Sequence, residues 1–362
     1  PEMREQIRRL DAAESIDPRH LGRLHRLLGE SYASAARSIV DAASLSFVQV
    51  LAMGCLGYPV GQECEGRFPG ELSLGMSAVL AERTGVTVVS DFRDRDLAAG
   101  GQGAPLGMVP DYILFRHPSQ GRLLVHLGGI SRLVYLSPGA KLPELIGFEA
   151  GPCNLLLNAM VRRLSGGREG YDSGGKHAVQ GRCIEPLLQT WLAHPTLQRR
   201  LPRRISRYTF GEAFADQAVS QLAQHGGTLH DLLCTATHFV ARCISSSVRR
   251  FLPPSSPIQE VLISGGGVRN GFLLHLLQQQ LKDLPLIRTD DRGVPALLRR
   301  AVSQGLLAAL TLDGVPANAP AATGAVGSRL LGSLTPGSAA NWAKCLQWLG
   351  QHAEIPAHLH DL

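Results

Sequence analysis

The sequence predicts an α/β protein with mixed sheets flanked by helices. Short apolar or β-branched runs alternate along the chain with longer helical patterns, which is typical of this class. The 362 residues, of which 44% are hydrophobic and 18% are charged, are enough for two cores rather than one. This composition excludes a disordered, collagen-like or coiled-coil chain. No internal repeat of fixed short period is visible.

The first expected elements are helices. Leu21, Leu24 and Leu28 recur at helical spacing, so residues 1–47 are expected to be helical. A short apolar strand is expected at 48–53. The segment 57–71 is rich in Gly, Pro and Glu, which favours an exposed hairpin or loop.

The later elements are bounded by glycines and polar residues. Strands are expected at 86–90, 123–127, 133–136 and 261–264. Helices are expected at 77–84, 154–164, 212–225, 229–251, 271–282 and 295–312.

The net charge of +6 comes from 36 basic against 30 acidic residues, and almost all of the basic ones are arginine. Their pairs are scattered at near-helical intervals, which favours solvated helix faces over a nucleic-acid footprint. Aromatic residues, which would strengthen the second interpretation, make up only 5% of the chain. No nucleic-acid partner is expected. The pairs are Arg8-Arg9, Arg162-Arg163, Arg199-Arg200, Arg203-Arg204, Arg249-Arg250 and Arg299-Arg300.

The seven cysteines form no C-x-x-C pair, so metal-ligand spacing is missing and no metal-ligating residue is expected. Buried, reduced thiols in the cytoplasm are favoured over a disulfide framework. No apolar run approaches the roughly 18 residues of a membrane helix. The charged N-terminal segment does not resemble a secretion signal, so neither a membrane partner nor secretion is expected.

Two glycine turns are candidate ligand sites. Gly265 to Gly267 follow an expected strand and open an expected helix. Consecutive glycines let a ligand lie against the backbone, and the start of the helix offers N–H groups to an anion; a tight turn without a ligand is the alternative. Gly128 and Gly129 join two expected strands, so their amides either cradle phosphate oxygens or form a plain type I′ hairpin.

The richest polar segment follows the expected strand 86–90. Asp91, Arg93 and Asp96 lead there into the glycine-rich loop 98–106. Alternating carboxylates and guanidiniums at the end of a strand favour a polyhydroxylated ligand, because such loops usually carry binding sites. A ladder of surface ion pairs is the alternative.

Glu149 lies in the run 148–154, on an expected turn before a helix whose N-cap is expected at Asn154. Its position in the chain between the two glycine turns makes it a candidate general base. A solvated loop glutamate is the alternative.

In this order, the segments resemble the anhydro-N-acetylmuramic acid kinase family, which belongs to the actin, hexokinase and Hsp70-like ATPase superfold. The resemblance covers about residues 5 to 338. Its most specific part is 88–106, which contains Val-Val-Ser-Asp-Phe-Arg and Ala-Ala-Gly-Gly-Gln-Gly-Ala-Pro-Leu. It continues through 127–130, 148–154, 171–175, 265–270, 322–325 and 331–337.

The resemblance implies a two-lobed kinase of ribonuclease H-like fold that binds ATP and the anhydro sugar between its lobes. Such an enzyme opens the 1,6-anhydro ring with water while it phosphorylates the released 6-oxygen. The reaction recycles an amino sugar of the cell wall in the cytoplasm. A carboxylate activates the water, and Mg²⁺ accompanies the phosphates.

Matching of motifs assigns residues to these roles. The expected base is Glu149. Arg93, Asp96 and Gln102 are expected to bind the sugar. The expected nucleotide-binding residues are Gly128 and Gly129 for phosphate and Gly265, Gly266 and Gly267 for adenosine. The expected lobes are 1–122 and 123–337, followed by an amphipathic tail at 338–362, and a homodimer is left open.

The sequence departs from the family pattern at several hydrogen-bonding positions. The family's Gly-Thr-Ser-x-Asp-Gly phosphate loop has no counterpart in it, so the first lobe is expected to lack its N-terminal hairpin. The expected base is Glu149 instead of Asp, and polar groups are replaced at 52–58 and 73–76. Two functions therefore stand. One is a kinase of the anhydro sugar, and the other is a catalytically inactive homologue that acts as a sugar or nucleotide sensor or as an interaction module.

Overall fold

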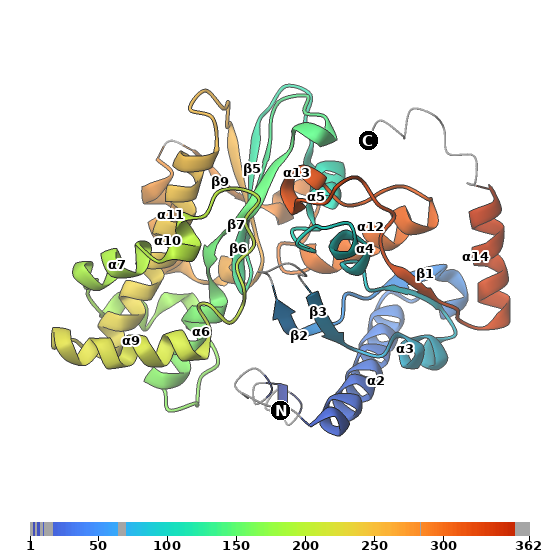
Figure 1. Ribbon diagram of the computed structural model, residues 1–362, viewed down its shortest axis with the longest axis horizontal. Coiled ribbons are helices and arrows are strands. Elements are labelled where there is room, and N and C mark those ends of the chain that lie inside the picture. The colour runs from blue at the N-terminus through green and yellow to red at the C-terminus, as the bar shows by residue number, and fades with distance from the viewer. Residues whose placement is uncertain are drawn as a thin grey trace. The chain divides into compact units, whose positions relative to one another are not determined.

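The computed structural model describes residues 17–63, 70–282 and 284–351, together with Met3, Gln6, Ile7 and Leu10 (Figure 1). The chain forms two compact units, one composed of Pro1–Pro110 with Ala301–Leu362 and the other of Asp111–Arg300. The helices α5 (Met108–Phe115) and α12 (Arg299–Leu312) carry the chain from one unit into the other. The predicted α/β class with mixed sheets and flanking helices is confirmed.

The first unit contains a three-stranded sheet in the order β1-β4-β10 and a separate hairpin of β2 and β3. Strand β1 is parallel to β4, and β10 is antiparallel to it. The strands are β1 (Ala52–Gly54), β2 (Tyr58–Glu63), β3 (Gly70–Leu74), β4 (Thr87–Ser90) and β10 (Ser333–Thr335). The helices are α2 (Pro18–Ala42), α3 (Ser77–Thr84), α4 (Asp94–Ala98), α13 (Pro320–Thr323) and α14 (Ala339–Gln351).

The expected N-terminal elements are partly corrected. Helix α2 begins after Asp17, whose side chain accepts a hydrogen bond from the amide of Arg19 at 2.9 Å, and it ends at Ala42. The expected strand 48–53 is wrong over most of its length, because Phe47–Gln49 form a 3₁₀ turn that the Gln49 side chain closes onto the amide of Ser46. Residues 1, 2, 4, 5, 8, 9 and 11–16 of the expected helix lie outside the described part of the chain.

The second unit is built on a five-stranded sheet in the order β7-β6-β5-β8-β9. Strands β5, β6 and β7 form an antiparallel meander, whereas β8 and β9 run parallel to β5. The strands are β5 (Arg122–Leu127), β6 (Ile130–Leu136), β7 (Ile146–Pro152), β8 (Glu260–Ser264) and β9 (Leu286–Arg288).

Helices pack against one face of this sheet. Leu123 and Val125 of β5 and Phe148 of β7 share a buried core with Phe239 of α10. Figure 1 shows α10 next to α11, and α10 contacts β6 and β7. The helices of this unit are α6 (Asn154–Leu164), α7 (Glu185–Leu192), α8 (Pro195–Gln198), α9 (Glu212–His225), α10 (Leu229–Phe251) and α11 (Gly271–Gln280).

The compact units divide the chain differently from the expected lobes 1–122 and 123–337. Strand β10 returns to pair with β4, so the chain from Ala301 onward clusters with the first unit. In α14, the Asn341 side chain accepts a hydrogen bond from the amide of Thr87 at 2.7 Å, which holds most of the expected tail 338–362 to the same sheet. Residues 352–362 of that tail lie outside the described part.

The expectation that the arginine pairs are solvated is wrong at three positions. Arg203, Arg204 and Arg299 are buried. The Arg299 guanidinium forms an ion pair with Asp111, which is also buried, and desolvation lowers the pKa of Arg299 to about 9. No described helix is long and apolar enough to cross a membrane.

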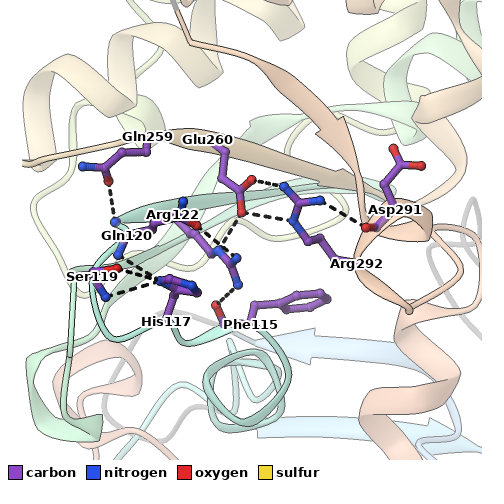
Figure 2. Close-up of polar contacts among 10 residues, drawn as sticks. Phe115, His117, Ser119, Gln120, Arg122, Gln259, Glu260, Asp291 and Arg292 are labelled. Carbon is purple, nitrogen blue, oxygen red and sulfur yellow. Dashed lines mark hydrogen bonds and ion pairs between the residues drawn. The ribbon is translucent and has the colours of Figure 1, made fainter.

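A buried carboxylate joins β5 and β8 at the edge of the sheet where both strands begin. Figure 2 shows Arg122 and Arg292 meeting at Glu260, and the Arg122 Nε lies 2.6 Å from a Glu260 oxygen. Arg122 also donates to the carbonyl of Phe115 at 2.9 Å. Although burial opposes ionisation, Arg292 and Arg122 hold the pKa of Glu260 below its ordinary value.

We predict that Glu260→Gln lowers the free energy of unfolding by about 3 kcal/mol, because it leaves Arg122 nearly buried without a countercharge. Urea unfolding of the whole chain measures the change. Asp290→Asn is the matched control, since Asp290 pairs with Arg288 at the surface and such pairs contribute little. Equal losses in the two variants would contradict the prediction.

Candidate active site

The two glycine turns lie against each other in the second unit. His126 of β5 pairs with Ser264 of β8, so the segments that follow these parallel strands leave the sheet at the same edge. A Cβ atom on Gly265 would lie 2.6 Å from the carbonyl oxygen of Leu127, and one on Gly267 would lie 2.6 Å from the Leu127 Cβ. The backbones approach so closely that only glycine fits at these two positions.

Asn154 fastens the first turn to helix α6. Its side-chain nitrogen donates to the carbonyl of Leu127 at 2.9 Å, and its amide donates to the carbonyl of Gly128 at 3.0 Å. The expectation that Asn154 caps α6 is wrong, because Cys153 is the N-cap residue and Asn154 is the first residue of the helix. The Asn154 side-chain nitrogen would lie 3.4 Å from a Cβ on Gly266, so this side chain borders both turns.

The first turn leaves its amides available. Within the described part of the chain, the amides of Gly128 and Gly129 donate no hydrogen bond, although the carbonyl of Gly128 accepts one and that of Gly129 accepts two. Gly129 is exposed, and β5 and β6 form the expected hairpin on either side of it. Two adjacent N–H groups without protein acceptors are suited to oxygen atoms of an anion.

A row of polar side chains crosses the sheet beside this turn. Ser264 of β8 pairs with His126 of β5, His126 pairs with Arg132 of β6, and Arg132 pairs with Glu149 of β7. Directly paired residues place their side chains on the same face of a sheet. Since Leu127, Leu133 and Phe148 belong to the core on the opposite face, the polar row faces away from α10.

Glu149 lies in strand β7, so its expected placement on a turn is wrong. One oxygen of its carboxylate accepts a hydrogen bond from the amide of Ile205 at 2.6 Å. Its backbone carbonyl accepts from the Arg203 side chain at 2.9 Å, and its backbone amide donates to the Arg203 carbonyl at 3.2 Å. The carboxylate therefore has a fixed position next to Arg132.

His126 is held in the row as a neutral ring. Its Nδ1 lies 3.1 Å from the Ser264 hydroxyl. Burial, followed by the positive charges of Arg132 and Arg300, lowers the pKa of His126 to about 3. At neutral pH this imidazole therefore carries no charge.

In the first unit, Arg93 lines a polar pocket of about 140 Å³. Its guanidinium forms an ion pair with Glu71 of the β2–β3 hairpin. Asp91 and Asp94 also line the pocket, and Asp91 has a positive φ of 54°, a strained conformation that is more frequent at functional sites. Burial, together with the charges of Asp91 and Glu71, raises the pKa of Asp94.

The structure encloses Asp96 completely. Its carboxylate accepts hydrogen bonds from the amide of Gly103 at 2.8 Å, from the Asn318 side chain at 2.8 Å and from the Thr323 hydroxyl at 2.7 Å. The amide of Gln102 donates to the carbonyl of Thr323 at 2.8 Å. Asp96 therefore positions the glycine-rich loop that carries Gln102. The Arg93 side chain, by contrast, lines the polar pocket.

Among the described residues, no three or more His, Cys, Asp or Glu side chains lie together so that they could hold a metal ion. The described cysteines are free thiols, and all except Cys183 are buried; Cys64 lies outside the described residues. Burial raises the pKa of Cys153 to about 12 and that of Cys234 to about 11, which makes both thiols poor nucleophiles.

Sequence reasoning missed four groups that the structure brings to these sites, namely Glu71, His126, Arg132 and the amide of Ile205. His126 and Arg132 are charged or titratable residues within mostly apolar strands. A polar residue in such a strand is a signal that could have identified them. Nothing in the local sequence marks Glu71 or Ile205.

Comparison with known proteins supports the resemblance. The family model described as "AnmK: Anhydro-N-acetylmuramic acid kinase" matches residues 1–337. The chain is 33% identical over 339 residues to the anhydro-N-acetylmuramic acid kinase of Bacillus cereus (strain AH820), which covers 92% of this chain and 88% of the relative. It is 34% identical over 336 residues to that of Gloeobacter violaceus (strain ATCC 29082 / PCC 7421), with 92% and 87% covered.

Likenesses to solved structures are more distant. A ROK family glucokinase from Streptomyces griseus in complex with glucose and AMPPNP has 11% identity and a TM-score of 0.31, over 76% of this chain and 86% of that one. The activator of 2-hydroxyisocaproyl-CoA dehydratase from Clostridium difficile with bound ADPNP has 15% identity and a TM-score of 0.35, over 56% and 63%. Likenesses as distant as these say nothing about the site.

We predict that His126 makes the protein less stable in acid. Between the ordinary histidine pKa of 6.5 and about 3, the unfolded chain binds a proton that the folded chain excludes, so the free energy of unfolding falls as the pH is lowered through this window. The slope attributable to His126 is at most about 1.4 kcal/mol per pH unit.

Urea unfolding of the wild type and His126→Asn at a series of pH values measures this slope. The His126→Asn curve should be shallower, and His275→Asn, at an exposed position of α11, is the matched control for the substitution. Parallel curves for the wild type and His126→Asn would disprove the prediction.

Proposed function

The chain belongs to the anhydro-N-acetylmuramic acid kinase family, and on this premise we propose that it phosphorylates 1,6-anhydro-N-acetylmuramic acid with ATP. Water adds to the anomeric carbon, the bond from that carbon to the 6-oxygen breaks, and the 6-oxygen receives the γ-phosphoryl group. The products are N-acetylmuramic acid 6-phosphate and ADP. We place this reaction in the cytoplasm, where ATP is supplied.

One observation in the molecule carries this proposal. The glycine turns at 128–129 and 265–267 and the carboxylate of Glu149 gather at one edge of one sheet. Phosphoryl transfer depends on positioning and charge stabilisation more than on covalent chemistry by the protein. Amide donors beside a fixed carboxylate provide both elements of that machinery.

In the proposed reaction, Glu149 accepts the proton of the attacking water. The amide of Ile205 fixes one carboxylate oxygen, which keeps the base in one orientation. Gly128 and Gly129 bind phosphate oxygens through their amides, and Gly265 to Gly267 lie along the adenosine. These assignments follow the family motifs and the geometry of the two turns.

The sugar is assigned to residues of the first unit. Arg93 lines the polar pocket and donates to sugar oxygens. Gln102 is assigned to the sugar by the family motif alone. Asp96 contributes by holding that loop through Gly103 rather than by direct contact. We propose this division because the structure encloses the Asp96 carboxylate.

Mg²⁺ is proposed to accompany ATP. In kinases Mg²⁺ commonly keeps several waters and is held by one or two carboxylates together with the substrate phosphates. When bound, Mg²⁺ neutralises charge on the phosphates.

We predict that Glu149→Gln lowers kcat by about 10²- to 10⁴-fold, because the amide cannot accept the proton of the water. Glu149→Asp shortens the side chain by one methylene and should cost roughly 100-fold. The measurement is ADP release that depends on the anhydro sugar, and calorimetry with ATP checks that the variants still bind nucleotide. A wild type without sugar-dependent phosphoryl transfer would refute the function, whereas an unchanged rate in Glu149→Gln would refute only the role of Glu149.

We predict that Arg93→Gln raises KM for the sugar roughly 10- to 100-fold and leaves KM for ATP nearly unchanged, because a charged hydrogen bond to the sugar is lost. Arg95→Gln is the matched control, since Arg95 is an exposed residue of helix α4, of which Arg93 is the N-cap residue. Steady-state kinetics in both substrates distinguish the two variants. An equal KM for the sugar in both would remove Arg93 from the site.

A further inference from the structure

The guanidinium of Arg132 contains a buried nitrogen without a hydrogen-bond partner. This nitrogen is the Nε. Within the part of the chain that the structure describes, the Arg132 side chain forms no ion pair and no hydrogen bond at any of its nitrogens. Buried polar groups in proteins are nearly always paired, and a partly buried cation without a partner is costly. This group therefore points to an anion that completes it.

The charges around Arg132 agree with an anionic ligand. Burial lowers the pKa of Arg132, and Glu149 acts in the opposite direction without forming an ion pair with it. At the neighbouring His126, both charged groups that shift the pKa, Arg132 and Arg300, are cationic. Positive charge is thus concentrated at the end of β5, next to the first glycine turn.

His126 presents a ring nitrogen to the same turn. A Cβ atom on Gly128 would lie 3.0 Å from its Nε2, and one on Gly265 would lie 3.0 Å from its Cε1. Its Nδ1 is engaged by the Ser264 hydroxyl at 3.1 Å. When that hydroxyl donates to Nδ1, the ring proton resides on Nε2, which then acts as a donor toward Gly128.

We propose that Arg132 and the Nε2–H of His126, together with the amides of Gly128 and Gly129, form a subsite for the terminal phosphates of ATP. This proposal rests on the proposed kinase function and adds two side chains to its phosphate site. Arginine is suited to the role because its planar guanidinium stays charged and binds phosphate oxygens in pairs. His126 adds a neutral donor. Because its ring carries no charge, it can bind phosphate without competing with Arg132 for the negative charge of Glu149.

The position of Arg132 in the polar row predicts a second effect, on the rate of the reaction. Arg132 stands between His126 and Glu149 in the strand pairing. A phosphate bound to Arg132 is therefore next to the general base, and the guanidinium reduces the repulsion between the two anions. The charge of Arg132 should accordingly affect kcat as well as the affinity for ATP.

The test measures binding of ATP, ADP and adenosine to the whole chain by calorimetry. Arg132→Gln should weaken ATP binding tenfold or more, weaken ADP binding less and leave adenosine binding unchanged. Arg132→Lys keeps the charge and should recover part of the loss, and His126→Gln should weaken ATP binding severalfold. The affinity of Arg132→Gln for ATP should also depend less steeply on salt concentration than that of the wild type.

Arg122→Gln is the matched control. Arg122 lies on the same face of the same strand as His126, but at the opposite end, and it is paired with Glu260 (Figure 2). This variant should lose stability and keep the wild-type affinity for ATP. Thermal unfolding of every variant separates loss of the fold from loss of the subsite, and if Arg132→Gln does not fold, His126→Gln and Arg132→Lys provide the test.

The outcomes separate this proposal from the kinase function. Wild-type affinity for ATP in folded Arg132→Gln or Arg132→Lys and in His126→Gln would overturn the subsite, even if the wild type phosphorylates the sugar. Loss of ATP binding in Arg132→Gln but not in Arg122→Gln would support the subsite, even if no sugar-dependent transfer occurs. A wild type that does not bind ATP would overturn it as well.

Discussion

One extra residue in strand β7 determines which side chains form the candidate active site. Ser131 pairs with Gly151, but Arg132 pairs with Glu149, so Ala150 is bulged between them. In a regular ladder Arg132 would face Ala150 and Glu149 would face Leu133, whose side chain belongs to the core. Because side chains alternate between faces, the bulge moves Glu149 out of the core and next to Arg132.

The bulge is held by contacts with the rest of the unit. The Ser131 hydroxyl donates to the carbonyl of Gly151 at 2.9 Å. Helix α10 approaches so closely that a Cβ on Gly151 would lie 2.6 Å from the Cβ of Cys243. The packing of α10 against the sheet and the absence of a side chain at Gly151 thus fix the register that orients Glu149.

Much of the fold could be predicted from local sequence. The expected helices 154–164, 212–225 and 229–251 coincide with α6, α9 and α10. Their apolar periodicity is strong, and clear signals mark their ends. Gly226 adopts a left-handed conformation after α9, and Thr228 and Asp231 cap the start of α10 reciprocally. The glycine turns were found for the same reason, since their chemistry is local. Glu149 was a candidate both from its position between the two glycine turns and from the family resemblance, but neither predicted its place in a strand.

The remaining features depend on contacts between distant parts of the chain. His126 meets Ser264, which is 138 residues away, only because β5 and β8 run parallel. The enclosure of Asp96 depends on Asn318 and Thr323, which are brought to it by the return of the chain into the first unit. Local sequence patterns do not indicate which residues of distant segments lie opposite each other. They could therefore not show that Asp96 holds a loop or that His126 joins a polar row.

The two ends of one sheet face show why partners, more than residue types, distinguish a site from a structural contact. Arg122 and His126 lie on the same face of β5, opposite Glu260 and Ser264 of β8. At the first end, the Glu260 carboxylate forms ion pairs with two guanidiniums of the protein. At the other end, within the described structure, the Arg132 guanidinium forms no hydrogen bond or ion pair and the amides of the adjoining turn donate to no acceptor. Buried polar groups without a partner are rare in native proteins, and a bound ion is one explanation for them, so the end of the face with unpaired donors is the one at which we expect binding.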